Sequence, residues 1–548
     1  MIICLYIFLI FSFFYTVFYR EKKSLHMLQQ NLYNENNRYL KWIFKNIGEL
    51  VSPDILSLLL SIAGFIWFKD DITISSSLII IMSCILIYTG YTSFKKIIND
   101  QNKKKLVVTA RIKRLIFTTT LIYLAPLVIL GLNTSNIEVA WIIIIIESVL
   151  VYLNAFVVFI ALLINMPVEK MIFYKFMHQA KTKLKRMNNL KIIGITGSYG
   201  KTSSKNILAD ILNVRYNAYP TPRNLNTYNG LMMTINNYMD KFTEIFIAEM
   251  GAYVRGEIKG LCKFIKPKYG ILTKIGTAHL ESFGSQENIQ KGKFELIESL
   301  PSDGFGVLNG DDPLQINYNL KNKVKIIWIG IDNKDVDVRA TNIKCSNKGT
   351  EFDVVLKDDK KKYHFQTKLL GKHNVYNILA GIACGIEFDI EMESLIHAVK
   401  GVKPVEHRLE LKKLGNFYQI DDAYNSNPVG AKNACEILGM MPGLKVVVTP
   451  GMIELGDKED EYNEEFGKQI AEVADKVILI GEKKTKPIKK GLLEKKFNED
   501  DIIVFNDVRD AYPFIGELQV KKKYMHYLKM IYQTHLMKNR RVKIWRLE

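Results

Sequence analysis

The first 166 residues alternate long apolar stretches with short polar ones, whereas the remainder mixes the two at shorter range. Most of the five apolar stretches approach the ~20 residues that a bilayer-crossing helix needs. The first has no basic start and no small-residue cleavage site, which favours an uncleaved anchor over a signal peptide. We therefore expect an N-terminal domain, residues 1–166, of five transmembrane helices at Met1–Tyr19, Ile55–Phe68, Ile72–Phe94, Leu115–Leu132 and Val139–Met166.

The lysines and arginines of this part lie on one side of the predicted membrane. They follow the first apolar stretch and fill the segment between the third and the fourth, whereas residues 133–138 contain none. The positive-inside rule then places everything after residue 166 in the cytoplasm, so we expect a multi-pass protein of the cell membrane. Glu147, inside the fifth stretch, either lines a polar path or a substrate head-group site, or it is paired within the bundle or lies near its edge.

A basic segment, residues 167–190, follows the last apolar stretch and also carries aromatic residues. This composition predicts a juxtamembrane helix lying against anionic lipid. The formal net charge of +19 over 548 residues would also suit nucleic acid. Because the basic residues cluster beside the membrane and in the tail, we expect membrane lipid as the partner, and no nucleic acid. The six cysteines show no metal-ligand spacing.

The rest of the chain reads as two α/β domains, residues 191–402 and 403–548. The first alternates strands and helices, and Phe305–Leu370 reads as a small antiparallel layer added to its sheet. A helix follows over Gly371–Gly385. The alternation restarts near residue 402, which predicts a doubly wound domain. Its strands are expected at Phe417–Asp421, Lys445–Thr449, Lys476–Gly481 and Ile502–Phe505.

A glycine turn, GSYGKT at Gly197–Thr202, joins the strand Ile192–Thr196 to a helix over Ser203–Leu212. Such a turn places backbone N–H groups around phosphate oxygens at a helix N-terminus. Lys201 can then reach the terminal phosphates, and Thr202 can hold Mg²⁺. The spacing departs from the eight-residue phosphate loop, and the alternative is a glycine turn with an incidental lysine. We predict a nucleotide site that includes Gly197, Ser198, Gly200, Lys201, Thr202 and Ser203.

Two further residues follow strands that should lie in the same sheet. Glu249 ends the strand Glu244–Met250, and His279 follows the strand Tyr269–Gly276. The carboxyl ends of such strands meet where ligands bind in open α/β sheets. Glu249 suits Mg²⁺, which prefers oxygen ligands, whereas His279 is equally consistent with a structural role.

Several polar residues are consistent with either a functional role or an ordinary structural one. The Asn-rich loop Thr221–Gly230 either binds a polar substrate or is a solvated connector. Lys293 reads by default as an exposed helix lysine. The asparagines at 374 and 377 share a helix face, and they are either ligands or a cap with a solvent-facing neighbour. The candidate substrate residues are Asn224, Asn226 and Asn229 in the loop, with Asn425 and Asn427 in the turn Asp421–Pro428.

The order of motifs from about residue 190 to 515 resembles the Mur ligase family, and within it the branch that adds D-alanyl-D-alanine to peptidoglycan precursors. The resemblance implies an ATP-dependent ligation of a carboxylate to an amine through an acyl phosphate, with ATP and Mg²⁺ as cofactors. The matching pieces are ITGSYGKTSSK, RNLNTYNG, EMGAYVRGEI, IGTAHLESFGS with KGKFE, GKHNVYNILA, EHRLE, IDDAYNSNP and PGMIELG.

The same resemblance implies roles for individual residues. Lys201, Lys293, His279 and Arg408 would be catalytic, with Arg408 facing phosphate after domain closure. The Mg²⁺ ligands would come from Thr202, Glu249, His279 and Lys293, the last as a carbamate. Asn374 and Asn377 would lie on the adenine side, and Asp422 would contact the ribose.

Two features depart from the family pattern. Membrane helices stand where relatives carry the domain that holds UDP, so the precursor is either UDP-linked or lipid-linked. The strongly basic tail after Val520 shows no clean strand pattern, and it is either a lipid-binding tail or the result of a reading-frame slip. The alternatives to a cell-wall ligase are a ligase of the poly-γ-glutamate or capsule type and a non-catalytic membrane scaffold with a nucleotide site.

Overall fold

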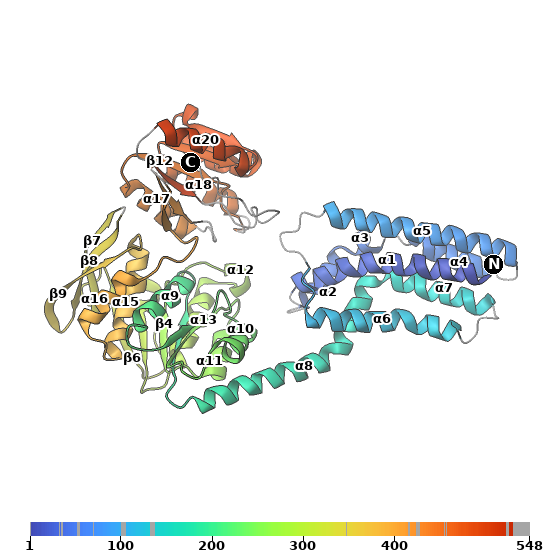
Figure 1. Cartoon of the computed structure of the whole chain (residues 1–548), viewed down its shortest axis with the longest axis horizontal. Helices are drawn as coiled ribbons and strands as arrows, with labels where there is room; N and C mark the ends of the chain where they lie inside the picture. Colours follow the sequence, from blue (N-terminus) through green and yellow to red (C-terminus); the bar gives the residue numbers. More distant parts are fainter. Residues whose placement is uncertain are drawn as a thin grey trace, which may run out of the picture. The chain divides into compact units, whose positions relative to one another are not determined.

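The computed structural model divides the chain into two compact units, Met1–Lys175 and Phe176–Glu548 (Figure 1). The first is all helical, and the second contains two β-sheets with covering helices. The structure describes residues 2–31, 33, 37–51, 55–68, 71–99, 106–131, 137–346, 348–414, 417–422, 428–453, 455, 458–521 and 525–529.

The first unit is a helical bundle in which α1 packs along α5 and α4 packs along α7. Its interior includes many small polar side chains beside the apolar ones, and several of them bond to backbone or to each other, as Ser61 does to Ser148 at 2.9 Å. The helices are α1 (Ile2–Gln30), α2 (Arg38–Lys45), α3 (Ile47–Val51), α4 (Ile55–Phe68), α5 (Ile72–Asn99), α6 (Ala110–Gly131), α7 (Ile137–Tyr152) and α8 (Asn154–Arg186).

The expectation of five crossings is wrong for the described residues. Among them, three segments are long and apolar enough to span a membrane: Thr73–Ser93, Ala110–Ile129 and Asn154–Arg186. Ile55–Phe68 and Trp141–Tyr152 are shorter apolar helices. The stretch predicted as one crossing at Val139–Met166 is divided at Leu153, between α7 and α8. The break coincides with a polar side chain, because Asn154 donates to the Tyr123 hydroxyl at 2.8 Å and accepts from Ser24 at 2.6 Å.

Glu147 lies in α7 and is buried. Neither of its carboxylate oxygens has a hydrogen-bond partner among the described residues, so pairing within the bundle gains no support there.

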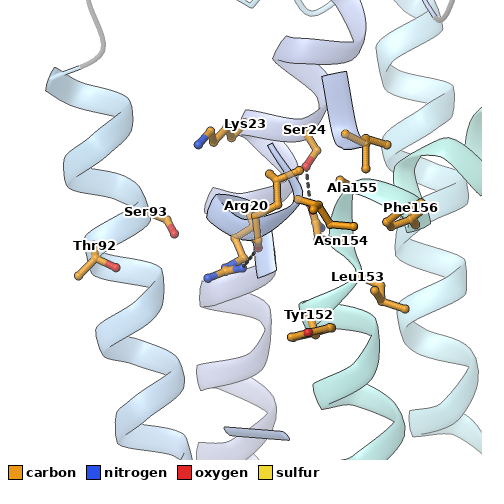
Figure 2. Close-up of a pocket in the computed structure, with 13 residues that line it drawn as sticks. Arg20, Lys23, Ser24, Thr92, Ser93, Tyr152, Leu153, Asn154, Ala155 and Phe156 are labelled. Atoms are coloured by element: carbon orange, nitrogen blue, oxygen red, sulfur yellow. Dashed lines mark hydrogen bonds between the residues drawn. The ribbon is translucent and has the colours of Figure 1, made fainter. Parts of the chain in front are cut away.

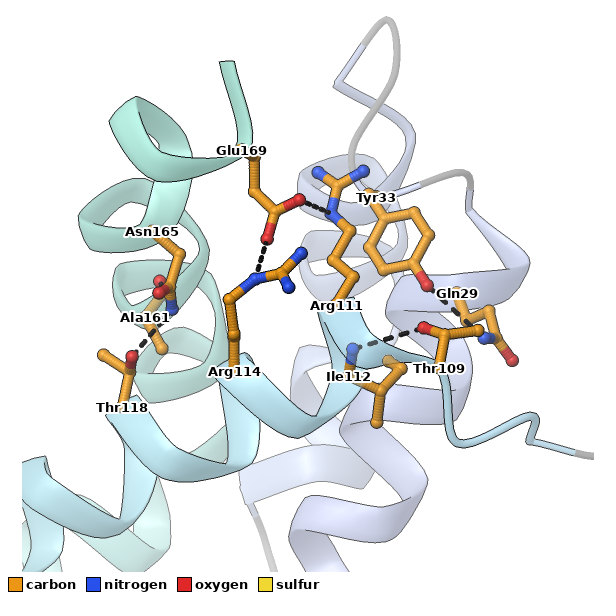
Figure 3. A network of polar contacts seen from close by, with 10 residues as sticks. All are labelled: Gln29, Tyr33, Thr109, Arg111, Ile112, Arg114, Thr118, Ala161, Asn165 and Glu169. Carbon is orange, nitrogen blue, oxygen red and sulfur yellow. Dashed lines mark hydrogen bonds and ion pairs between the residues drawn. The ribbon is translucent and has the colours of Figure 1, made fainter. Parts of the chain in front are cut away.

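A polar network ties α6 to α8 (Figure 3). Arg114 Nε donates to Glu169 Oε1 at 2.7 Å, and Arg111 Nε lies 3.8 Å from Glu169 Oε2. Further along the same pair of helices, Asn165 donates to the Thr118 hydroxyl at 2.8 Å. Helix α8 continues without interruption through the basic segment to Arg186, so that segment is helical as predicted.

The larger sheet of the second unit has the strand order β2-β3-β1-β4-β5-β6-β7-β8-β9. Strands β2 to β7 pair in parallel, and only the β7-β8 and β8-β9 pairs are antiparallel. The strands are β1 (Lys191–Thr196), β2 (Ala218–Pro220), β3 (Ile245–Glu249), β4 (Tyr269–Leu272), β5 (Phe305–Asn309), β6 (Lys325–Gly330), β7 (Val338–Ser346), β8 (Gly349–Leu356) and β9 (Asp359–Thr367).

The expectation of an antiparallel layer over the whole of Phe305–Leu370 is therefore partly wrong. Strands β5 and β6 extend the parallel sheet, because their apolar residues alternate against the helices that cover the other parallel strands. The antiparallel part begins only at β7 and stays within the same sheet.

Helices cover both faces of this sheet. One face packs against α9 (Lys201–Leu212), α15 (Lys372–Glu387) and α16 (Met392–Gly401) through Ile193, Ile195 and their neighbours. The other face packs against α13 (Gln286–Glu298), where in-register glycines of β1, β4 and β5 leave no room for a side chain. The remaining helices are α10 (Tyr228–Met233), α11 (Glu257–Ile265), α12 (Leu280–Phe283) and α14 (Pro313–Ile316).

The second sheet has the order β10-β11-β15-β12-β13-β14 and is parallel except at β10. Helices α17 (Pro428–Met440), α18 (Glu459–Ala471), α19 (Glu482–Glu494) and α20 (Val508–Lys521) complete it, which confirms the predicted doubly wound domain. The strands are β10 (Glu410–Leu414), β11 (Phe417–Asp421), β12 (Leu444–Thr449), β13 (Lys476–Ile480), β14 (Ile502–Phe505) and β15 (Met525–Lys529).

The basic tail contains one strand that the sequence pattern did not predict. Met525–Lys529 pairs in parallel with both β11 and β12, in the middle of the sheet. Because a central strand gets its partners from distant segments, its own short sequence need not show a two-residue alternation. Residues 530–548 lie outside the described part.

Candidate active site

The glycine turn connects β1 to α9 and is held by the segment that follows β4. Ser198 donates its backbone N–H to Lys274 O at 2.9 Å, and the Thr273 hydroxyl donates to Tyr199 O at 2.6 Å. Gly197 has φ 149°, and a Cβ there would collide with the Thr273 hydroxyl, while Gly200 has φ 85°. Because an L side chain fits neither position, the turn depends on glycine and leaves its backbone open to a phosphate.

Lys201 begins α9 and folds back over the turn. Its Nζ donates to Gly197 O at 2.7 Å and to Ser198 O at 3.2 Å. Burial lowers the pKa of Lys201 to about 8; the Glu249 carboxylate opposes this shift and the Arg408 guanidinium adds to it. The ammonium thus lies where the terminal phosphates of a nucleotide on this turn would need a cation.

Glu249 ends β3 and gathers three polar groups, two from α9 and one from the loop before α10. Its Oε1 accepts from the Thr202 hydroxyl at 3.3 Å and from Asn226 Nδ2 at 3.1 Å. Its Oε2 lies 2.8 Å from Lys205 Nζ. A hydroxyl and a carboxylate side by side at the carboxyl edge of a parallel sheet form the oxygen donor set that Mg²⁺ prefers, so Thr202 and Glu249 fit that ion.

Lys205 is a site residue that the sequence analysis missed. Both Lys205 and Glu249 are at most 2% exposed, and Lys205 also donates to the Arg223 carbonyl. The available signal was helical spacing, because Lys205 falls on the same stripe as the buried Leu208 and Leu212. A lysine on an apolar stripe requires a buried acceptor, and Glu249 supplies it.

Lys293 is buried in α13, so the expectation of an exposed helix lysine is wrong. It is 1% exposed, its Nζ contacts Ala252 O at 3.4 Å, and it lies 5.3 Å from the centre of the Phe283 ring. Burial lowers the pKa of Lys293 to about 7, and the charge of Lys201 adds to the shift. The close packing of α13 on the sheet glycines brings this face of the helix inward.

His279 sits just before α12 in a left-handed conformation, with φ 63°. Its ring meets that of Tyr253 edge-on at 4.5 Å. Partial desolvation and then the charges of Lys201 and Lys293 lower the pKa of His279 below its ordinary value. A neutral imidazole can serve as a metal ligand, whereas a protonated one cannot. The influence of the two lysine charges also places His279 in the same electrostatic neighbourhood as the glycine turn.

The two asparagines of α15 are buried and lie against the start of α9. Ser204 donates its hydroxyl to Asn377 Oδ1 at 2.6 Å, and Asn377 Nδ2 donates to Asn374 Oδ1 at 3.3 Å. Asn374 in turn donates to Leu370 O at 2.9 Å. The reading of a cap with a solvent-facing neighbour is therefore wrong, because both side chains are at most 8% exposed.

Arg408 stands between two residues in the left-handed conformation, His407 with φ 60° and Leu409 with φ 50°. Leu409 N donates to Asp422 Oδ1 at 3.3 Å, and burial raises the pKa of Asp422 to about 6. Since the Arg408 charge acts on Lys201, the start of the C-terminal domain lies within electrostatic range of the glycine turn.

The remaining predicted residues are less strongly tied to this cluster. Ser198 donates its hydroxyl to Gly276 O at 3.1 Å, and Ser203 lies in the first turn of α9. Asn224 and Asn229 are exposed beside Asn226. Asn425 and Asn427 lie outside the described residues.

Comparisons with known proteins match this part of the chain. The model of the Mur ligase middle domain matches residues 195–385, and that of the Mur ligase glutamate ligase domain matches residues 407–523. The UDP-N-acetylmuramoyl-tripeptide–D-alanyl-D-alanine ligase of Bacillus subtilis (strain 168) is 33% identical over 343 residues, 62% of this chain and 72% of that relative. The ligase of the same name from Escherichia coli (strain K12) is 30% identical over 294 residues, 53% of this chain and 64% of that relative.

Solved structures agree with the sequence relatives. A crystal structure of MurF from Acinetobacter baumannii matches with a TM-score of 0.58 and 25% identity, over 66% of this chain and 78% of that one. The structure of MurF ligase from Thermotoga maritima in complex with ADP also has a TM-score of 0.58 and 25% identity, over 66% of this chain and 81% of that one. On its sequence, its sheet topology and the residues around its glycine turn, this chain belongs to the Mur ligase family of ATP-dependent ligases.

Proposed function

We propose that this protein is a membrane-anchored, MurF-like ligase that joins D-alanyl-D-alanine or a similar amine to the carboxylate of a peptidoglycan precursor. The names of the relatives support the substrates, since each describes a ligase for UDP-N-acetylmuramoyl-tripeptide and D-alanyl-D-alanine. The observation that carries the proposal is Lys201 folded over the glycine turn with Thr202 bonded to Glu249 next to it, and the charges of Arg408 and Lys293 act within range of Lys201. Three cations at one phosphate site suit a reaction whose charge develops on phosphoryl and acyl oxygens.

In this proposal the protein binds ATP on the glycine turn and Mg²⁺ between Thr202, Glu249 and His279. Bound Mg²⁺ would compensate the negative charge of the phosphates. Lys201 would hold the terminal phosphates, Asn374 and Asn377 the adenine side, and Asp422 the ribose. The ADP complex of the Thermotoga maritima enzyme supports the nucleotide.

The reaction that we propose has two balanced steps. The substrate carboxylate attacks the γ-phosphorus of ATP, which forms an acyl phosphate and releases ADP. The amine then attacks the acyl carbon, and a tetrahedral intermediate expels phosphate while the nitrogen loses a proton. Arg408 and Lys201 would neutralise the oxygens that gain charge in both steps.

Lys293 has a second proposed role as a carbamate. A buried amine with a pKa near 7 is substantially neutral at physiological pH, and only the neutral amine adds to CO₂. The product is a carbamate and a released proton. The carbamate would supply the anion that a further Mg²⁺, or its bound water, requires.

The four-part division of the chain, at residues 166, 190 and 402, stays a proposal, as does residence in a membrane with the catalytic part in the cytoplasm. Support for the membrane comes from the three long apolar segments. Because the family matches begin at residue 195, a lipid-linked precursor is a second candidate beside a UDP-linked one.

One substrate screen tests the function. Full-length protein in detergent with Mg²⁺ and UDP-N-acetylmuramoyl-tripeptide is expected to hydrolyse ATP only when D-alanyl-D-alanine is added. Turnover that instead requires glutamate would favour the poly-γ-glutamate or capsule-type reaction. The absence of turnover with either amine, and with UDP- and lipid-linked precursors alike, would favour the scaffold and refute the ligase.

A further inference from the structure

A small cavity of about 60 Å³ opens in the helical unit where α1, α2, α3 and α5 meet the break between α7 and α8 (Figure 2). Its volume suits a few water-sized groups or one phosphate group. The described residues that line it are Arg20, Lys23, Ser24, Ile43, Ile47, Leu50, Thr92, Ser93, Tyr152, Leu153, Asn154, Ala155 and Phe156.

The polar part of this lining includes two cationic side chains. Figure 2 shows Arg20 and Lys23 projecting from α1, with Thr92 and Ser93 on the neighbouring α5. The guanidinium of Arg20 reaches Leu50 O at 3.4 Å, which directs it across the cavity toward α3. The hydroxyls of Ser24, Thr92 and Ser93 donate to Asn154 and to the Thr89 carbonyl, so the two cations are the groups that would recognise an anion here, above all the tetrahedral oxygens of a phosphate.

The break between α7 and α8 borders this cavity and is held firmly. Asn154, the first residue of α8, is 4% exposed and bonded on both sides to Ser24 and Tyr123. The start of α8 therefore faces the cavity in a fixed orientation.

The cavity lies at the level where two packed helices both change character. Helix α1 is apolar up to Tyr19 and basic from Arg20, and α5 is apolar up to Phe94 and basic from Lys95. Exposed aromatic side chains stand next to this level at Phe18, Tyr88 and Tyr91. Aromatic residues beside a transition from apolar to basic mark the headgroup region of a membrane.

We propose that this cavity binds a phosphate group of an anionic membrane lipid. The hydrocarbon chain would lie along the exposed apolar side chains of α1 and α5, and the phosphate would contact Arg20 and Lys23 beside the start of α8. The inference rests on the membrane residence proposed above and not on ligase activity. Basic pockets between membrane helices recognise lipid phosphates in this way.

The test measures lipid binding to the full-length protein in an uncharged detergent by native mass spectrometry, without nucleotide or amine. The probes are a short-chain phosphatidic acid, a short-chain polyprenyl diphosphate, a diacylglycerol that has chains but no phosphate, and inorganic phosphate. Saturable binding of at least one phosphate lipid is expected, with no comparable binding of diacylglycerol. Equal binding of diacylglycerol would overturn the proposal, and so would a site that inorganic phosphate fills and neither lipid can enter.

Matched variants assign the binding to the cavity. Arg20→Ala/Lys23→Ala is expected to weaken lipid binding about tenfold or more, the factor that the loss of a charge-assisted hydrogen bond produces. Lys22→Ala removes a charge from the same helix outside the cavity lining, and it should leave binding unchanged. An equal loss in Lys22→Ala would mean non-specific attraction and would refute the site.

Two controls keep the outcome clear. Arg20→Lys retains the charge and should keep most of the binding. If the double variant does not fold, Lys23→Ala alone replaces it and should still weaken binding. Amine-dependent ATP turnover is measured on the same preparations. A preparation that loses lipid binding but keeps normal turnover reports on the cavity alone. A preparation that loses turnover but keeps normal lipid binding reports on the proposed ligase.

Discussion

The buried ion pair between Lys205 and Glu249 offers the sharpest test of the site, because the effect of breaking it can be measured without an activity assay. The two charged atoms lie 2.8 Å apart, and neither side chain is more than 2% exposed. Lys205→Met removes one charge and keeps most of the volume. It leaves the Glu249 carboxylate in a buried position without its cation, which costs about 3–5 kcal/mol.

That cost should appear as local opening of the strands that carry the site. A loss of about 3–5 kcal/mol raises an opening equilibrium by roughly two to three and a half powers of ten. Hydrogen exchange of peptides from β1 and β3, measured on the full-length protein in detergent, reports this equilibrium. We expect exchange of both strands to accelerate, while peptides from the sheet β10–β15 change little.

Three comparisons decide whether the reasoning is right. Lys263→Met removes an exposed lysine of α11 and should have almost no effect. Lys205→Met/Glu249→Leu removes both charges and should recover much of the lost protection. Mg²⁺ with ADP should partly protect Lys205→Met, since a cation beside Glu249 would replace the lost one. If Lys205→Met exchanges like Lys263→Met, the pair does not hold Glu249 in place.

Three further outcomes follow from the same site. Lys293→Met should raise the Tm at pH 6, because it increases the free energy of unfolding by at most about 5 kcal/mol. This advantage should fade as the pH rises from 7 toward 10.5, since in that range the unfolded lysine binds a proton that the folded one, with a pKa of about 7, does not. A constant difference across a pH series of thermal melts would contradict this. Gly197→Ala should abolish binding of a fluorescent ATP analogue while the far-UV circular dichroism stays unchanged, because its Cβ would meet Thr273. Arg408→Ala should lower kcat about a hundredfold with little change in nucleotide affinity, and initial rates compared with equilibrium binding would reveal a purely structural role if both fell together.

The sequence by itself determined the parts of this protein that depend on local chemistry. The glycine turn, the strands β11 and β14 and the helix that carries Asn374 and Asn377 fall where their patterns predict them. Local backbone preferences and short-range periodicity are enough for such elements, because a glycine with positive φ or an apolar run after a turn has few alternatives. The order of the motifs then identified the family over the second unit.

Only the tertiary structure decided which side chains are buried and what they meet. Lys205 and Lys293 read as ordinary helix lysines until their helices pack against the sheet, where one meets Glu249 and the other reaches the Ala252 carbonyl. Strand β15 forms because two distant strands supply its partners, and the apolar stretch at 139–166 breaks at Leu153, where Asn154 meets Ser24 and Tyr123. In each case the deciding contact joins residues far apart in the chain, so the local sequence pattern around each residue does not reveal it.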